Sequence, residues 1–184
     1  MTESIGYEVV KAFDTVEIRR YPSIILATVR SPFGDAAFSI LFDYISGNNQ
    51  AAEKMPMTAP VISTRQGTKI KMTAPVISDD SAFSFVLPPD LDMDTAPRPV
   101  DPRIELVGVP SRHVAALRFS GRAYLRDVVE KERELMQWLN QRSIRTRGPP
   151  FLMRYNSPFA PGFMRRNEVG VEIFTDDLSG GMQG

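Results

Sequence analysis

The 184-residue chain contains no cysteine and only one histidine. The absence of cysteine excludes disulfides, thiolate metal sites and cysteine nucleophiles. A single histidine also excludes a metal site built from several histidines. The sequence has no Gly-x-Ser-x-Gly motif and no glycine-rich phosphate-binding loop. No catalytic constellation emerges, so the residues favour a binding protein over an enzyme.

The chain also lacks net charge and long apolar runs. Lysine plus arginine and aspartate plus glutamate both number 22, which predicts no nucleic acid partner. No apolar run approaches the roughly 20 residues that span a bilayer, so no membrane span is predicted. Residues 1–6 have neither the basic nor the apolar part of a secretory signal. These absences predict a cytoplasmic protein.

The patterns that are present predict an α+β protein. The length fits one domain, predicted over residues 1–178 and followed by a glycine-rich flexible tail at 179–184. Two amphipathic stretches predict helices at about 33–46 and 123–141. Alternating or continuous β-forming residues predict strands at 7–13, 16–21, 24–29, 83–87, 104–109, 113–119, 151–155 and 169–174.

A long-range internal repeat connects the two halves of the chain. When residues 17–30 are aligned with 105–118 without a gap, five of the fourteen positions are identical, including Pro22-Ser23 with Pro110-Ser111. In both copies a strand, a Pro-Ser turn, a second strand and a helix follow in that order. The repeat predicts two halves, at about 7–89 and 101–176, that are related by a pseudo-twofold axis. Chance similarity between β-rich segments is the alternative interpretation.

A second repeat is local and too close to be chance. The sequence Met-Thr-Ala-Pro-Val-Ile-Ser occurs at 57–63 and again at 72–78. Proline favours an extended conformation of the alanine before it, so the two copies can pair as a hairpin. One interpretation is a methionine-lined flap beside a pocket, and the other is an excursion packed on the core.

Several motifs in the same order over nearly the whole chain resemble the SOUL heme-binding family. They are YEV at 7–9, VEIRRY at 16–21, MTAPV at 57–61, RFSG at 118–121, YNSPFAP at 155–161 and RRNEV at 165–169. The resemblance implies a twisted antiparallel β-sheet or barrel flanked by two helices, with a pseudo-twofold internal duplication. It also implies a fold similar to bacterial effector-binding domains, and reversible binding of heme, another tetrapyrrole or a flat hydrophobic ligand.

The first predicted helix carries the candidate ligand-contacting face. Its apolar arc spans about 240°, which is wider than one buried stripe requires. The extra strip consists of Phe38, Phe42 and Ile45. It can pack under a neighbouring loop, contact a partner protein or second copy, or bind a flat ligand. In vertebrate members of the family this helix carries basic residues, whereas Ile40 and Asp43 stand here, which removes partners for heme propionates. The candidate binding residues are Phe38, Leu41, Phe42, Ile45, Met57, Met72, His113 and Tyr155.

Two polar residues offer more specific chemistry. His113 is the candidate axial ligand of a heme iron, although a lone strand histidine is more often a hydrogen-bonded structural residue. Glu168, in the charged run 165–168, is a candidate base for a small-molecule hydrolase of the effector-domain type. A salt-bridged structural role for Glu168 is the competing interpretation. A raised pKa of Glu168 in a deep groove would favour the enzyme.

Overall fold

A computed structural model describes residues 3–31, 34–64, 81–156 and 160–178. Its two helices are α1 (Gly34–Ile45) and α2 (Leu125–Gln141), and the short 3-10 turns are η1 (Gly162–Met164) and η2 (Thr175–Leu178). The strands are β1 (Glu3–Ser4), β2 (Glu8–Ala12), β3 (Val16–Tyr21), β4 (Ile24–Arg30), β5 (Thr58–Thr64), β6 (Ala82–Val86), β7 (Ile104–Val109), β8 (Arg112–Ser120), β9 (Thr146–Arg154) and β10 (Arg166–Ile173).

A long bent ribbon of two antiparallel segments forms the frame of the sheet. Strands β3 and β4 follow one another along one segment, and β7 and β8 follow one another along the other. Tyr21 pairs with Arg112 on one side of the bend, and Ile24 pairs with Val109 on the other. The register is therefore continuous across the two Pro-Ser dipeptides, which lie opposite each other at the corner. The Ser111 hydroxyl donates a hydrogen bond to the Tyr21 carbonyl there, at 2.8 Å.

The ribbon has the pairing that the long-range repeat predicts. Val16 pairs with Leu117 in β3 and β8, and the residues 88 positions away, Ile104 and Val29, pair in β7 and β4. The same equivalence holds for every pair along both strand pairs. With the offset of 88 residues, β3 (Val16–Tyr21) falls on β7 (Ile104–Val109), and β4 (Ile24–Arg30) falls on residues 112–118 of β8, so the bounds of the elements support the repeat.

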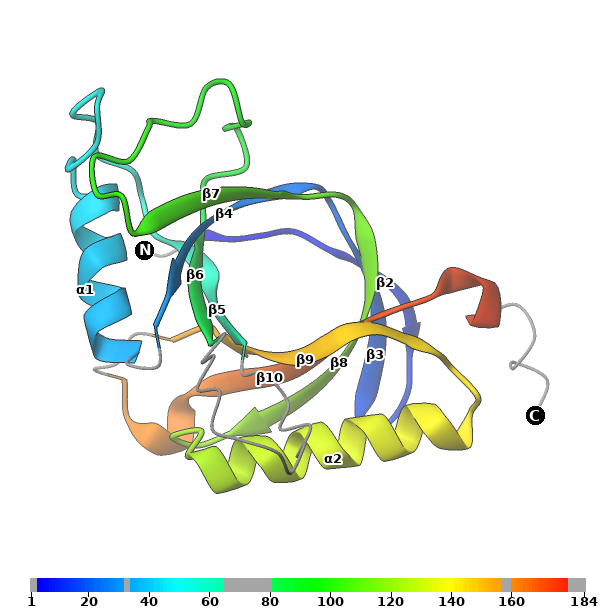
Figure 1. Ribbon diagram of the computed structural model, residues 1–184. Coiled ribbons are helices and arrows are strands. Elements are labelled where there is room, and N and C mark those ends of the chain that lie inside the picture. Colours follow the sequence, from blue (N-terminus) through cyan, green and yellow to red (C-terminus); the bar gives the residue numbers. More distant parts are fainter. Residues whose placement is uncertain (1–2, 32–33, 65–80, 157–159, 179–184) are drawn as a thin grey trace, which may run out of the picture.

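The sheet order shows the same internal symmetry. The strands run in the order β2-β3-β8-β10-β9-β5-β6-β4-β7. Exchanging β3 with β7, β4 with β8, β5 with β9 and β6 with β10 reverses the path from β3 to β7 onto itself. The pseudo-twofold axis therefore lies between β5 and β9, where the two halves meet. The sheet curls into a half-barrel around this axis (Figure 1).

Each helix covers one half of the outer face of the curled sheet (Figure 1). Under α1, Leu41 and Tyr44 pack on Phe85 and Ala27 from β6 and β4. Under α2, the apolar residues of β3, β8 and β10 meet Leu135 and Leu139. Alternation along the strands sends the remaining side chains to the inner face.

The structure corrects one sequence prediction and leaves others outside the described residues. The sequence predicts that the strand at 151–155 begins at residue 151, yet β9 begins at Thr146 and includes Gly148-Pro149-Pro150. A register shift between Gly170 and Glu172 of β10 accommodates them, as expected where proline cannot complete a ladder. The first Met-Thr-Ala-Pro-Val-Ile-Ser copy supplies β5, whereas the second copy and the tail at 179–184 lie outside the described residues.

Candidate ligand-binding site

The predicted ligand-contacting residues of α1 divide into a buried set and an exposed edge. Leu41 and Ile45 are buried in the core beneath the helix. Phe38 is half-buried and meets the Phe85 ring edge-on, with ring centroids 5.2 Å apart. Phe42, one turn later, is 47% exposed. Most of the extra apolar strip thus packs inside the protein, and Phe42 is its exposed edge.

Phe38 and Phe42 form a stacked aromatic pair. Their ring centroids lie 6.0 Å apart and the rings are tilted by only 13°. The four-residue spacing places them on the same helix face, because a helix has 3.6 residues per turn. Phe85 holds Phe38 from below, so the pair is fixed at its inner end. This arrangement presents a flat apolar surface to solvent through Phe42.

Of the two predicted methionines, the structure describes only Met57. Met57 precedes β5, is half-buried and packs against the same core as α1. Met55, which the sequence reasoning did not select, packs there as well. Met72 lies outside the described residues. Of the predicted site, the structure therefore groups Phe38, Leu41, Ile45 and Met57 around one core cluster, with Phe42 at its surface.

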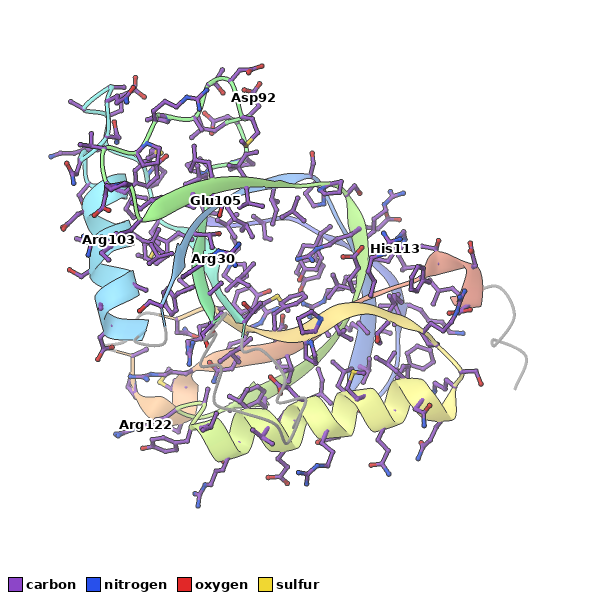
Figure 2. The ribbon with its side chains drawn as sticks, in the orientation of Figure 1. Arg30, Asp92, Arg103, Glu105, His113 and Arg122 are labelled. Atoms are coloured by element: carbon purple, nitrogen blue, oxygen red, sulfur yellow. The ribbon has the colours of Figure 1, made fainter. Side chains whose placement is uncertain are left out.

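His113 lies apart from this group. It stands in β8 and pairs with Arg20 of β3, and Figure 2 places it on the opposite side of the barrel from α1. It is only half-buried. The structure therefore does not bring His113 together with Phe38 and Phe42, and one ligand at α1 would not reach its imidazole. Among the described residues, no group of three or more acidic or histidine side chains could hold a metal ion.

The inner face of the half-barrel is filled by its own side chains. Tyr21, Phe151 and Met153 pack there with Ile5 and Ile62. The cavity that remains has a volume of about 10 Å³, which is at the lower limit for one water molecule. A ligand in this groove would have to displace packed side chains.

Arg112 and Gly170 explain how this face is closed. The Arg112 guanidinium lies 4.9 Å from the centre of the Phe151 ring and pairs with Glu172 at 3.5 Å. A Cβ on Gly170 would come within 2.8 Å of Phe151 and 2.9 Å of Met153. The absence of a side chain at Gly170 therefore lets both large residues lie flat against the sheet. A glycine inside a strand pattern is the sequence signal for such an approach.

Glu168 lies on the same inner face, fully buried, in a network of arginines. Arg19 donates to its two oxygens, at 2.6 and 2.8 Å. Arg166 donates to Oε1 at 2.8 and 3.2 Å. Arg118 approaches Oε1 at 3.7 Å from the solvent side. The carboxylate therefore has cations around both oxygens.

This network decides the protonation of Glu168. Burial by itself would raise the pKa of the carboxyl, but the hydrogen bonds and positive charges of Arg19 and Arg166 outweigh it and the pKa lies below its ordinary value. A general base needs a pKa near the working pH and a free lone pair. The geometry therefore supports the salt-bridged structural role of Glu168. Sequence reasoning missed Arg19, although the alternation in β3 puts Glu17, Arg19 and Tyr21 on one face.

Tyr155 belongs to the Glu168 network and not to the α1 surface. The Arg166 guanidinium lies 4.2 Å from the centre of its ring. Burial, together with nearby Tyr21 and Glu168, raises the pKa of the Tyr155 phenol. Tyr7 closes the network at the N-terminal end, because its hydroxyl accepts a hydrogen bond from Arg166 at 3.1 Å and its ring lies 4.2 Å from Arg19. Tyr155 therefore remains a protonated phenol.

Comparison with known proteins gives a family match and several similar folds. The sequence profile of the SOUL heme-binding protein family matches residues 2–172. A comparison with curated proteins found no match. Among solved structures, the EcmrR C-terminal domain superposes with a TM-score of 0.60 at 13% identity, covering 91% of this chain and 98% of that chain.

Two further solved structures share the architecture. A hydrolase from Listeria innocua has a TM-score of 0.56 at 12% identity, with 90% of this chain and 94% of that chain covered. SAV2435 bound to tetraphenylphosphonium has a TM-score of 0.52 at 9% identity, with 96% and 98% covered. At these identities the likeness concerns the fold, which is that of effector-binding-like domains.

Proposed function

We propose that this chain, which belongs to the SOUL heme-binding protein family, reversibly binds a tetrapyrrole or a similar flat apolar ligand at the α1 surface. The observation that carries the proposal is the stacked Phe38–Phe42 pair, whose outer ring is 47% exposed. Phe85 fixes the inner ring, so the surface exists before a ligand arrives. A preformed surface lowers the entropy lost on binding.

Apolar contact supplies the attraction in this proposal. Aromatic rings favour offset stacking on other π systems, and Phe42 presents a ring nearly parallel to that of Phe38. Covering the exposed part of Phe42 would contribute roughly 2 kcal/mol. Asp35 and Asp43 lie on the exposed side of the same helix, so the carboxylates of a heme would be repelled along α1. A ligand with few negative charges, or one whose propionates point into solvent, fits this surface better.

No histidine takes part in the proposed binding. His113 lies on the far side of the barrel (Figure 2), and the methionines near α1 are half-buried in its core. Heme and its metal-free porphyrin should therefore bind with similar affinity. The expectation distinguishes stacking on an apolar surface from axial ligation, in which the iron is essential.

The effector-domain hydrolase is the alternative that the geometry favours less. It would need Glu168 as a base, and the arginines around that carboxylate keep it ionised and occupied. Tyr155 keeps its proton as well. The small cavity on the packed inner face is lined by neither Glu168 nor Tyr155.

A titration with hemin, followed by Soret absorbance, tests the proposal. Saturable binding is expected in the wild type and in His113→Ala, and protoporphyrin without iron should quench tryptophan fluorescence over the same concentration range. Phe42→Ser should lower the affinity for hemin and for protoporphyrin by about tenfold, because the exposed ring is lost. Val9→Ser is the matched control, since Val9 of β2 is equally exposed and lies on another strand.

Three results would contradict the proposal. Absence of saturable binding would exclude tetrapyrroles as ligands of this protein. A Soret shift that His113→Ala abolishes would assign the iron to His113. Unchanged binding in Phe42→Ser would move the site away from α1.

A further inference from the structure

The three most exposed large apolar side chains of the described residues lie on two neighbouring segments. Leu125, Phe163 and Met164 are 63%, 81% and 64% exposed, which are the three highest values among the large apolar residues described. Tyr124 adds a fourth at 53%. We call these four residues the apolar tip. None of them belongs to a core cluster of the described chain.

Two chain segments that touch form the apolar tip. One is the start of α2 and the other is η1, and Figure 1 shows the η1 segment beside the first turn of α2. A Cβ on Gly162 would come within 2.9 Å of the Arg122 side chain. Arg122 also donates a hydrogen bond to the Tyr124 hydroxyl at 3.4 Å. The two segments that carry the four apolar residues are therefore in contact through Gly162 and Arg122.

Local structure holds these residues out from the barrel. Ala123, with a positive φ of 53°, is buried between Arg122 and Tyr124 and turns the chain so that Tyr124 and Leu125 face solvent. In η1, the Met164 amide donates to the Pro161 carbonyl at 2.9 Å. Arg165 donates to the Ala160 carbonyl at 2.8 Å. The tip is thus a hydrogen-bonded structure that exposes apolar groups.

The surroundings of the tip are positively charged, although the chain as a whole is neutral. Residues 118–126 and 160–167 contain no acidic residue and five arginines, at positions 118, 122, 126, 165 and 166. Arg118 and Arg126 are largely exposed, and Figure 2 shows Arg122 at the lower edge of the molecule beside the start of α2. Asp127 offsets Arg126 in part, at 3.5 Å. The negative charge of Glu168 offsets part of the positive charge of Arg166 and Arg118.

We propose that the apolar tip and its arginines dock this protein on the surface of an anionic lipid bilayer. Phe163, Met164 and Leu125 would enter the boundary between headgroups and acyl chains. The arginines would stay at the level of the lipid phosphates, which guanidinium groups bind with paired hydrogen bonds. No described helix has the length and apolarity to cross a membrane, so the contact is peripheral.

The shape of the tip favours a bilayer over a protein partner. The apolar groups project from the start of α2 and from the short turn η1, and their exposure rises to 81% at Phe163. A protein interface usually requires a broader surface, of about 800 Å² on each partner. A bilayer accepts isolated apolar side chains without shape complementarity, and an anionic leaflet attracts the nearby arginines.

Vesicle flotation with the full chain tests this inference. The protein should float with vesicles of equal parts phosphatidylcholine and phosphatidylglycerol, and about tenfold less with phosphatidylcholine alone. Raising the salt concentration should weaken the binding, because phosphate–arginine attraction is screened. The double variant Phe163→Ser/Met164→Ser should lose at least about tenfold in binding. Arg122→Glu/Arg126→Glu should lose the preference for anionic vesicles.

A matched control is available at the edge strand β2. Val9 and Val10 are exposed apolar residues outside the tip, and Val9→Ser/Val10→Ser should float like the wild type. Circular dichroism and the thermal midpoint confirm that each variant is folded. Failure of the wild type to float with anionic vesicles, or unchanged flotation of Phe163→Ser/Met164→Ser, overturns the inference. If the wild type is a dimer that does not bind vesicles, and Phe163→Ser/Met164→Ser converts it to monomers, then the tip contacts a second copy. This result also overturns the inference.

Discussion

Arg19 of β3 and Glu168 of β10 form a buried ion pair with two hydrogen bonds, at 2.6 and 2.8 Å, although 149 positions separate them in the sequence. Strand β8 lies between their strands. Its small residue Ala116 pairs with both Glu17 and Gly170, which leaves space for the two long side chains to meet. The pair therefore joins the N-terminal and C-terminal strands of the fold.

Breaking this pair should cost more stability than breaking an exposed one. Arg19→Met leaves the buried Glu168 carboxylate short of its main partner, and we expect the free energy of unfolding to fall by about 3–5 kcal/mol. Urea denaturation measures this change. In the control Arg20→Ala, which removes an exposed ion pair with Glu8, the loss should stay below about 1 kcal/mol. A loss of that small size in Arg19→Met would show that solvent reaches the pair.

The same carboxylate should make stability depend on acid pH. Because the pKa of Glu168 is lower in the folded protein than in the unfolded chain, its stabilisation is fully present above the unfolded value of about 4.3. It is lost as pH falls through the lowered folded value. Urea midpoints measured from neutral pH down to about pH 3 should fall more steeply in wild type than in Glu168→Gln. Parallel curves would mean that other groups, such as Asp177, control acid unfolding.

Gly170 should not tolerate a side chain. The added methyl group of Gly170→Ala would lie 2.8 Å from Phe151 and 2.9 Å from Met153, and we expect a loss of about 1–3 kcal/mol in unfolding free energy. Phe151→Leu should restore part of that loss in the double variant, since the ring causes the closest contact. Gly6→Ala serves as the control, because nothing lies within 4 Å of its Cβ position. Equal stability of both single variants would contradict the packing described for the inner face.

Tyr44 should contribute stability that disappears at alkaline pH. Its buried hydroxyl donates to the Pro97 carbonyl at 2.6 Å, and burial raises the pKa of the phenol to about 12. Its contribution is present below the unfolded pKa of about 10 and is lost as pH rises toward 12. Tyr44→Phe should lower the unfolding free energy by about 1–2 kcal/mol at neutral pH. Tyr124→Phe, at an exposed tyrosine, should leave the unfolding free energy unchanged. A phenolate absorbance titration of the wild type and of both variants shows which tyrosine ionises late.

Local patterns in the sequence were enough to predict the elements and their internal relationship. Strand alternation, the helical stripes and the 88-residue repeat depend on local periodicity and on which residues are identical, so they could be read without coordinates. The repeat was informative because Pro22-Ser23 and Pro110-Ser111 mark a corner that both halves need. The predicted start of the strand at residue 151 was wrong, because a register shift in the distant β10 lets Pro149 and Pro150 fit into β9.

Which side chains meet depends on how the strands and helices pack together. The pairing of Arg19 with Glu168 depends on the order of β3, β8 and β10, which no local pattern contains. His113, Phe42 and Tyr155 were assigned to one site because each suits a ligand, yet β8, α1 and the segment that follows β9 place them in three different environments. Exposure of the apolar tip at Phe163 likewise depends on what the rest of the chain leaves uncovered. Local sequence fixes conformation, whereas proximity and solvent exposure arise only when distant segments pack together.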